Sequence, residues 1–404
     1  MSYPINQPIT YTAVASTVGM PSDTFTYAWS FDDGGTGNTA SLSHTWTATG
    51  SRTATVTATD NVTLAVATAS KTINVMSYLW SIAGQTAGNG PVGAGVWGIQ
   101  GTKLLIAPGV TNTSTLVYDL LNNTFSAGPT LNLSVNYSAD SGGNRFSRAP
   151  IRSGDGQIYI QQTGTNAPQL VDIPSGIVTT LTAQTFNTSV TPLAVQGTDG
   201  LVYYIGMTGS FNKVYAHNPT TDTWVAKASS APTAILGSYP ISIGGNKFFT
   251  ISRQTNSGYV YDATGDSWTT STNTCGLSLG TNAVYRSMVV AGLVYSFGTS
   301  TGGNRLGSIY NISTNTFTNT AADAVERICP GLYLMENGQI HIICGSITSA
   351  TSVIYDPISN TYSSTYPMTN ASISNAIIHP VSGKPFAFGA GSSAPMYANI
   401  FDGL

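Results

Sequence analysis

The sequence predicts an all-β protein that consists of a small β-sandwich in residues 1–75 and a seven-bladed β-propeller in residues 76–404. Short segments that alternate apolar and polar residues occur along the whole chain, with turn-forming residues between them. One strand–turn–strand pattern recurs seven times after residue 100. A glycine opens an apolar segment at a similar distance before each copy. These three observations carry the prediction.

The composition is that of a folded protein with few charges. Only 8% of the residues are charged, whereas typical domains carry about 25%. The hydrophobic share is 41% and the aromatic share 10%, which is enough for a packed core. Because solubility in the cytosol more often depends on charge, we expect this protein outside the cell or on a particle surface.

The same counts argue against several classes of partner. The 14 Lys and Arg form no basic stripe, so we expect no nucleic-acid partner. No segment approaches 18 consecutive apolar residues, so we expect no membrane partner. The cysteines, Cys275, Cys329 and Cys344, have no CxxC spacing, which indicates reduced or buried thiols rather than a disulfide or zinc framework.

The N-terminus has no positive segment followed by an apolar one, as a secretory signal would. We therefore expect either that a signal has been removed or that the protein leaves the cell by another route. Release inside a virus particle is one such route.

The first 75 residues resemble a known domain family. The stretch Tyr27–Gly34, followed by His44-Thr45-Trp46, resembles the PKD (polycystic kidney disease) domain, an immunoglobulin-like fold with the core motif W-x-F-G-D-G and a later H-x-Y. Asp32 replaces the first motif glycine, and Trp46 replaces the tyrosine. The resemblance implies that Trp29 and Phe31 fill the core and that His44 makes a structural hydrogen bond. It also implies a spacer, or a contact surface for protein or sugar, without chemistry of its own.

Three aspartates of this module, Asp32, Asp33 and Asp60, could ligate calcium through their carboxylate oxygens. Adjacent aspartates in a glycine-rich turn are more often turn residues. We therefore expect no metal here.

Each copy of the repeated pattern is a hydrophobic pair, then Asp or Asn, then an aromatic or apolar residue six positions further on. Turn-formers lie between, so each copy predicts a strand, a tight turn and an outer strand. The copies, called markers below, are centred on Asp119, Asp172, Asn218, Asp262, Asn311, Asp356 and Asp402, and the first six have the partners Phe125, Val178, Trp224, Trp268, Phe317 and Tyr362.

The glycines keep step with the markers. They lie 16 to 19 residues earlier, at Gly101, Gly156, Gly200, Gly245, Gly292, Gly338 and Gly383. Successive markers are 44 to 53 residues apart, which is the length of a four-stranded propeller blade.

The seventh marker has no outer strand of its own, because the sequence stops two residues after Asp402. The segment Ser77–Ser81 has the pattern of an outer strand, with Trp80 in the role of Trp224. We predict that this segment pairs with the strand that ends at Asp402. The ring would then close and lose an open sheet edge.

The marker with its glycine-led strand resembles the Kelch repeat, which ends in V-Y-D-x-x-x-N-x-W, over residues 76–404. The double glycine usual after the second Kelch strand is mostly reduced to one glycine or none, as at Ile251-Ser252. The resemblance implies a divergent Kelch-type propeller.

Propellers of this type include copper radical oxidases, which need two histidines and two tyrosines around the metal. Outside the first module the chain has only His217, His341 and His379. His217 takes the tyrosine position of a marker and His341 lies in an apolar strand, so we expect both to be structural and no copper or other cofactor.

Three arginines, Arg148, Arg286 and Arg327, lie at or just before innermost strands, which line the channel of a propeller. They could converge at one mouth beside Glu326, as a sialidase-type site requires for a carboxylate, or they could brace the loops between blades. Trp97, Tyr239 and Tyr285 could stack on sugars or pack between inner strands. These seven residues are the candidate ligand-binding set, and no catalytic residue is assigned.

We predict a non-enzymatic structural or adhesion protein on a virion surface, such as a phage head decoration or tail fibre. Its N-terminal module would contact other virion or surface proteins, and its propeller would bind a host glycan or receptor. The alternative is a secreted, extracellular carbohydrate-active enzyme, a hydrolase or lyase, with its site at the channel mouth. A third possibility, an intracellular Kelch adaptor, is disfavoured by the low charge and the missing helical module.

Overall fold

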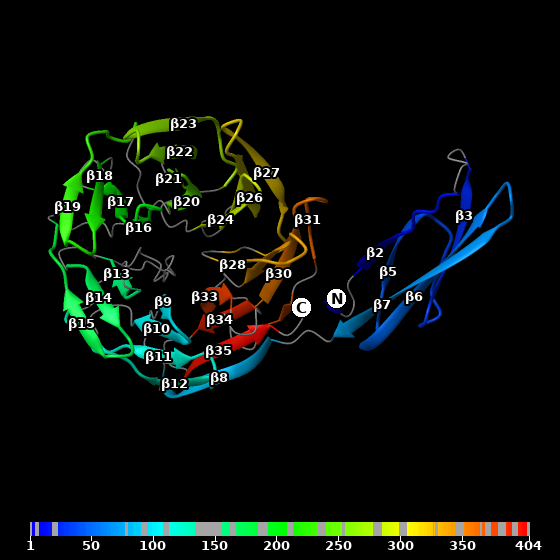
Figure 1. Cartoon of the computed structure of the whole chain (residues 1–404), viewed down its shortest axis with the longest axis horizontal. Coiled ribbons are helices and arrows are strands. Elements are labelled where there is room, and N and C mark those ends of the chain that lie inside the picture. Colours follow the sequence, from blue (N-terminus) through cyan, green and yellow to red (C-terminus); the bar gives the residue numbers. More distant parts are fainter. Residues whose placement is uncertain are drawn as a thin grey trace. The chain divides into compact units, whose positions relative to one another are not determined.

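The computed structural model of the chain is all-β: every element among the described residues is a strand (Figure 1). The chain divides into two compact units, one of Met1–Ser81 with Phe401–Leu404 and one of Ile82–Ile400. The predicted domain boundary after residue 75 stays a prediction. The structure describes residues 2–4, 8–17, 23–76, 80–89, 95–107, 113–133, 156–161, 167–184, 193–207, 213–232, 240–252, 255–277, 285–298, 305–325, 327, 330–343, 351–363, 366–367, 373–378, 385–389 and 395–401.

The first unit is a β-sandwich of two unequal sheets, as the sequence predicts. The larger sheet has the order β1-β7-β6-β3-β4, and the smaller one pairs β2 with β5. The strands are β1 (Ser2–Pro4), β2 (Pro8–Thr12), β3 (Phe25–Phe31), β4 (Thr36–Gly37), β5 (Ser41–Thr45), β6 (Gly50–Asp60) and β7 (Val66–Met76).

The core of the sandwich follows from the alternation along its strands. Trp29 and Phe31 face inward from β3 and are 6% and 5% exposed, as predicted. They lie opposite Val56 and Ala54 of β6, and residues directly opposite share one face of a sheet. The Trp46 indole is fully buried, and its Nε1 donates a hydrogen bond to the Tyr11 hydroxyl at 3.0 Å.

The second unit consists of seven sheets arranged in a ring (Figure 1). We number the sheets as blades 1 to 7 in chain order, and we give the described strands of each blade from the innermost outward. The strands are β9 (Gly95–Gln100), β10 (Lys103–Ala107), β11 (Leu116–Asp119) and β12 (Thr124–Ala127) in blade 1; β13 (Ile158–Ile160), β14 (Gln169–Asp172) and β15 (Ile177–Thr180) in blade 2; β16 (Leu193–Gln196), β17 (Val202–Met207), β18 (Lys213–Asn218) and β19 (Thr223–Ala226) in blade 3; β20 (Ile241–Gly244), β21 (Lys247–Ile251), β22 (Ser257–Asp262) and β23 (Ser267–Thr274) in blade 4; β24 (Arg286–Val290), β25 (Leu293–Phe297), β26 (Leu306–Asn311) and β27 (Thr316–Ala322) in blade 5; β28 (Gly331–Leu334), β29 (Ile340–Ile343), β30 (Thr351–Asp356), β31 (Thr361–Tyr362) and β32 (Tyr366–Pro367) in blade 6; and β33 (Ile373–Ile378), β34 (Pro385–Gly389), β35 (Pro395–Phe401) and β8 (Trp80–Asn89) in blade 7.

Blade 7 is a composite of the two ends of this segment. Its strand order is β33-β34-β35-β8, so the predicted closure by an N-terminal strand is confirmed. The closing strand differs in position from the prediction: β8 spans Trp80–Asn89 instead of Ser77–Ser81. Residues 77–79 lie outside the described part of the chain.

The glycines that precede the markers occupy one conformation. Gly101, Gly156, Gly200, Gly245, Gly292 and Gly338 all have positive φ, between +57° and +85°. Five of them lie just before the second strand of a blade, in the turn that reverses the chain after the inner strand, and Gly156 lies just before β13, the first described strand of blade 2. A residue with a Cβ is disfavoured there, which explains the repeated glycine. Gly383 lies outside the described residues.

A repeated side-chain hydrogen bond explains the marker. In four blades a tyrosine stands immediately before the marker Asp or Asn. Its hydroxyl donates a hydrogen bond to the side chain five positions after the tyrosine, at 2.7 to 2.9 Å, in the pairs Tyr118–Asn123, Tyr261–Asp266, Tyr310–Asn315 and Tyr355–Asn360. In blade 3, His217 replaces the tyrosine and bonds to Asp222 at 3.1 Å. The accepting residues all have positive φ, from +44° to +58°, which Asn and Asp tolerate best among non-glycine residues.

The same accepting residue also binds the preceding blade. Asn360 of blade 6 accepts from the Ala321 amide at the end of blade 5, at 2.7 Å. Asn315 of blade 5 donates to the Thr270 carbonyl of blade 4, also at 2.7 Å. Asp266 and Asp222 accept from backbone amides that follow the outer strands of blades 3 and 2. We call this arrangement the staple, because one side chain fixes its own turn and the neighbouring blade.

Replacing Asn360 tests the staple. Asn360→Ala should lower the free energy of unfolding by about 2–4 kcal/mol, because it leaves the Ala321 amide without its acceptor and puts a Cβ-bearing residue without a polar side chain at positive φ. Asn360→Gly removes the hydrogen bonds but relieves the backbone, so it should cost less. Chemical denaturation of both variants measures the difference; equal stability of all three proteins would contradict the staple.

Removing β8 tests the closure. A chain that starts at Pro91 should melt roughly 10 °C or more below one that starts at Met76, since each kcal/mol of lost pairing shifts Tm by about 2–4 °C at this size. Both chains lack the sandwich, so the comparison isolates the closing strand. Equal melting temperatures by calorimetry would disprove the closure.

Candidate functional site

The strand directions give the two ends of the ring different characters. In each antiparallel blade, the first and third strands begin at the end where the second strand stops. The short turns that join first to second and third to fourth strands therefore all lie at the other end. We call the end with these short turns the turn end. We call the opposite end, where the first and third strands begin, the connection end.

Arg286 lies at the connection end, as the first residue of β24. It pairs directly with Phe297, which packs in a cluster with Ile340 and Tyr355 of blade 6. Opposite residues share a face of the sheet, and Met288, two positions after Arg286, packs on the same cluster. The Arg286 side chain, which is half-buried, therefore lies on the side of blade 5 that faces blade 6.

Arg327 lies at the same end, before the first strand of blade 6. Its Nε donates to the Asp323 carboxylate at 2.6 Å, and its Nη1 donates to the Thr351 carbonyl at 2.9 Å. The arginine is 4% exposed and the aspartate 7%. Breaking such a buried ion pair costs about 3–5 kcal/mol. Arg327 thus braces the connection from blade 5 to blade 6.

Arg305 completes the group. It is exposed, it precedes β26, and its Nη1 donates to the Ala324 carbonyl at 2.6 Å. A cavity of about 20 Å³ lies beside it, lined also by Phe297, Gly298, Asp323 and Arg327. That volume has room for about one water molecule, so a larger ligand would bind outside it. Three arginines of blades 5 and 6 thus gather at one end of their interface.

The structure brings together only part of the predicted set. Tyr285 is fully buried, and its hydroxyl exchanges hydrogen bonds with the Ile251 backbone at 2.9 and 3.1 Å, so its ring belongs to the core of blades 4 and 5. Trp97 lies in β9, but its side chain is outside the described part. Arg148, Tyr239 and Glu326 also lie outside the described residues.

Arg305 was missed because only arginines at inner strands were considered. Its position immediately before the strand of a marker is the signal that could have found it: the third strand of a blade begins at the same end as the first.

The buried histidines of the ring have structural partners, as predicted. The Tyr159 hydroxyl lies 2.8 Å from His217 Nδ1 and 2.7 Å from the Tyr204 hydroxyl. His217 Nε2 faces the Asp222 carboxylate, which only accepts, so Nε2 carries the proton. His341 is fully buried, with Nε2 2.8 Å from the Ser352 hydroxyl. Burial, followed by the charge of Arg327, lowers the pKa of His341 to about 3.

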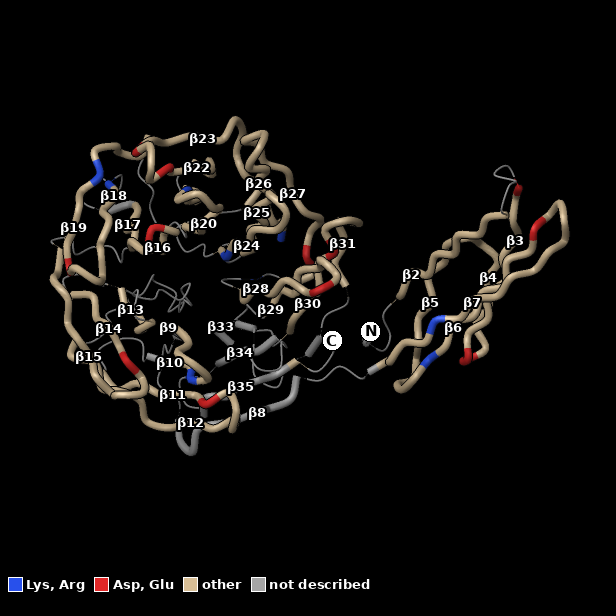
Figure 2. Tube along the Cα trace, in the orientation of Figure 1, with Lys and Arg blue, Asp and Glu red and all other residues tan. Residues whose placement is uncertain are grey.

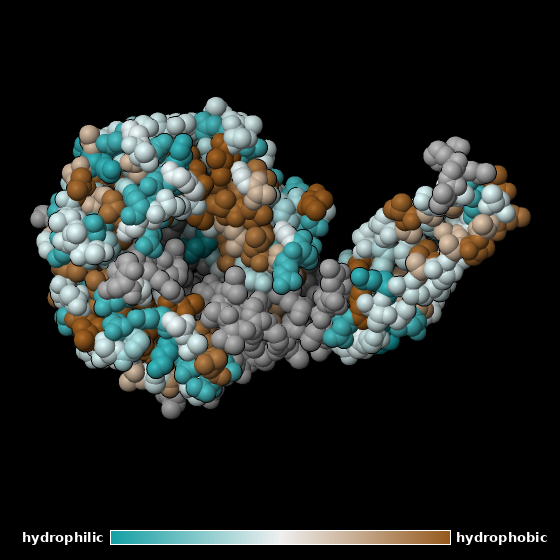
Figure 3. All heavy atoms as spheres, in the orientation of Figure 1, coloured by the Kyte–Doolittle hydropathy of each residue, from teal (hydrophilic) through white to brown (hydrophobic). Residues whose placement is uncertain are grey.

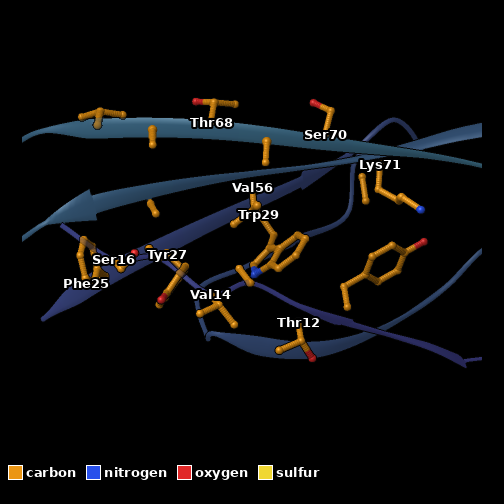
Figure 4. Close-up of a pocket in the computed structure, with 18 of the residues that line it drawn as sticks. Thr12, Val14, Ser16, Phe25, Tyr27, Trp29, Val56, Thr68, Ser70 and Lys71 are labelled. Carbon is orange, nitrogen blue, oxygen red and sulfur yellow. The ribbon is translucent and has the colours of Figure 1, made fainter. Parts of the chain in front are cut away.

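A second hollow lies within the sandwich unit. The two-stranded sheet covers only part of the larger one, which leaves a groove of about 890 Å³. Figure 4 shows Trp29 and Tyr27 beneath Val56 in this groove, whereas Thr68 and Ser70 point away from it. The groove is apolar, and the only charged residues lining it are Asp60 and Lys71. The Thr63 amide, the Thr17 hydroxyl and the Val62 amide donate hydrogen bonds to the Asp60 carboxylate and lower its pKa.

The other aspartates considered as calcium ligands serve separate turns. Asp32 accepts from the Thr53 amide at 2.7 Å, and Asp33 bonds to His44 at 2.9 Å. The His44 bond is the structural one that the sequence predicts. Among the described residues no three His, Cys, Asp or Glu form a group that could hold a metal ion.

Residues 4–87 match the model of the PKD domain family, so the N-terminal unit is an immunoglobulin-like PKD domain. No curated protein sequence matches this chain. Among 606 solved chains with a similar fold is a fungal alcohol oxidase of the AA5 family, solved in complex with copper. Its identity to this chain is 16% and its TM-score 0.60, and the match covers 80% of this chain and 76% of the oxidase.

This likeness corrects the functional prediction. The prediction of a non-enzymatic virion or adhesion protein depended on the premise that the ring only provides a contact surface. The same ring carries an oxidase in the similar structure, so the prediction that the chain is not an enzyme is wrong on this comparison. At 16% identity the likeness shows the fold, and the chemistry has to come from the residues of this chain.

The residues do not fit the copper set of two histidines and two tyrosines. The whole sequence has four histidines, and His44 belongs to the sandwich. His217 and His341 are fully buried and hydrogen-bonded, which leaves His379, outside the described residues, as the remaining ring histidine. A two-histidine centre would have to break one of these buried arrangements. We derive no step through copper.

In the part of the chain that the structure describes, no helix has the length and hydropathy to cross a membrane. The predicted virion location and virion partners, and the predicted lack of a nucleic-acid partner, stay predictions.

The buried histidines generate a pH prediction. The folded pKa of His341 lies below its unfolded value of about 6.5, so its contribution to stability is present above pH 6.5 and is lost as the pH falls toward 3. Between pH 6 and 4 the free energy of unfolding should fall by up to about 1.4 kcal/mol per pH unit for each such histidine.

His217, whose pKa burial also lowers, acts in the same direction. His341→Gln should therefore flatten the slope without abolishing it, as measured by urea denaturation at several pH values. A wild-type stability that stays constant between pH 6 and 4 would contradict the burial of both rings.

Proposed function

We propose that the chain is a secreted carbohydrate-active enzyme, a hydrolase or a lyase, with its site at the connection end of the propeller between blades 5 and 6. The observation that carries the proposal is the placement of Arg286, Arg305 and Arg327 at this end, where Arg305 and Arg327 line one small cavity. Each guanidinium offers five fixed donors that can hold several oxygen atoms of one ligand. The likeness to an oxidase supports the proposal at the level of the fold, because the same architecture supports catalysis.

The three arginines would have different roles. Arg327 is committed to Asp323 and the Thr351 carbonyl, so it positions the connection rather than the substrate. Arg305 is exposed and can reach a ligand directly. Arg286 lies on the face of blade 5 toward them. Arg286 and Arg305 are therefore the residues proposed to bind substrate, and Glu326, next to Arg327 in the sequence, is the candidate acid–base group.

We further propose that the propeller is of Kelch type. The support is the staple: in four blades the marker tyrosine and the Asn or Asp five positions later, both part of the Kelch-like pattern, make the same hydrogen bond. The low share of charged residues supports an extracellular location.

Turnover on a panel of glycans tests the enzyme. Hydrolysis yields a new reducing end without a double bond, and elimination yields a reducing end plus an unsaturated sugar that absorbs ultraviolet light, so two assays separate the classes. Arg286→Ala should lower kcat/KM by about 10- to 100-fold, the value of one charged hydrogen bond. Lys247→Ala, at the turn end, is the matched control and should leave kcat/KM unchanged.

Melting curves of both variants show whether they are folded. The absence of turnover on every glycan, or full activity of a folded Arg286→Ala protein, would contradict the proposal.

A further inference from the structure

The charges of the propeller are separated between its two ends. Among the described residues, the connection end carries four cationic side chains and one carboxylate, namely Arg286, Arg305, Arg327 and Lys213 with Asp323. The turn end carries eight carboxylates, namely Asp119, Asp172, Asp199, Asp222, Asp262, Asp266, Glu336 and Asp356, together with Lys103 and Lys247. Lys227 follows the outer strand of blade 3, and its Nζ donates to the Ala263 carbonyl of blade 4. Figure 2 shows acidic segments recurring around the ring, and basic ones beside β24, β18 and β10.

The carboxylates of the turn end are explained by the fold. Asp119, Asp262 and Asp356 each accept two backbone amides of the turn that follows. Asp222 and Asp266 are staple residues. Asp172 accepts from Gln100 and Asp199 from the Tyr203 hydroxyl. Seven of the eight therefore have a structural role and need no ligand to account for them.

Carboxylates are scarce at the connection end. Asp323 is the only described carboxylate there, and Arg327 engages it in the buried ion pair. Arg305 binds a single carbonyl through Nη1 and remains exposed. Among the described residues, the connection end thus keeps a positive excess at the proposed site, on a molecule whose net charge is −3.

We infer that the substrate of this site is an acidic polysaccharide, whose sugar carboxylates bind Arg286 and Arg305; the inference rests on the proposed function and names its substrate class. A planar guanidinium matches a carboxylate in a bidentate pair, and three of the four cations at this end are arginine. The opposite signs of the two ends steer an anionic chain toward the connection end and away from the turn end.

A sugar polymer fits this end better than a nucleic acid. Tight binding of duplex DNA draws on many phosphate contacts, with about 6–10 in well-studied cases. The described part of this end offers four cations, of which Arg327 is buried. A few carboxylates spaced along a polysaccharide match that small number.

Binding of polygalacturonate to the full chain tests the inference, with neutral dextran and duplex DNA as comparison ligands. We expect polygalacturonate to bind by isothermal titration calorimetry and dextran and DNA to bind at least about tenfold more weakly. Arg305→Gln should weaken binding of polygalacturonate about 3- to 10-fold, and Arg305→Lys should restore part of it. Lys103→Gln removes the same charge from the turn end and should have no effect.

The outcomes separate this inference from the proposed function. Selective binding of polygalacturonate without turnover on any glycan would support an acidic polysaccharide as the ligand and would contradict the proposed enzymatic function. Turnover on neutral glycans with no preference for polygalacturonate would support the enzyme and overturn the acidic substrate. Equal or tighter binding of DNA, or an equal loss in Lys103→Gln and Arg305→Gln, would also overturn it.

Discussion

The ring depends on one hydrogen bond, from a buried tyrosine hydroxyl to the Asn or Asp five residues later. A buried hydroxyl without a partner costs about 1–3 kcal/mol, so the accepting side chain is required wherever the tyrosine is buried. The same side chain then holds the backbone in the left-handed region and reaches the neighbouring blade, as Asn315 and Asn360 do. In blades 3 to 6, one residue per blade thus links the local turn to the packing of the ring.

The need for polar side chains in the tight turns of the blades decides where the carboxylates of the propeller lie. Turn-end aspartates such as Asp119 and Asp262 lower the energy of tight turns by accepting backbone amides, which also lowers the pKa of their carboxyl groups. On the face that Figure 3 shows, pale and teal regions surround apolar ones, of which the larger lies on the ring. On such a surface a few arginines can dominate the local field, which is why Arg286 and Arg305 matter more than their number suggests.

The sequence was sufficient for the fold because the fold is repetitive. A marker such as Tyr261-Asp262 with Trp268 reports a strand, a turn and a cross-strand pair at once, and the structure places Tyr261 directly opposite Trp268. The sequence predicts the closing strand but not its bounds. That β8 completes blade 7 follows from counting the blades, whereas the residues of β8 that pair with β35 depend on contacts between distant parts of the chain, which no local pattern records. The site was harder to predict. The places of Arg286 and Arg327 at inner strands predict that they lie at one end, and Arg305 joins them because the third strand of a blade begins at that end too.

The prediction of function from the sequence was wrong for a different reason. The sequence has no recognisable set of catalytic residues, and this absence favours a contact protein over an enzyme. Fold and chemistry are separable, as the likeness to an oxidase and the buried, bonded state of His217 and His341 both illustrate. The histidines of this chain therefore do not fit the copper set, but local motifs do not decide whether the chain is a catalyst.

The pairing of β8 with β35 also has a consequence for biosynthesis. The ribosome makes β8 before any blade and β35 after the other strands of the ring, so blade 7 cannot assemble until both have been synthesised. Until then β8 is an unpaired strand, and such strands invite pairing with other chains. A ribosome that stalls within the last blade would release a chain whose ring is open, and quality control could recognise that chain by its exposed edges.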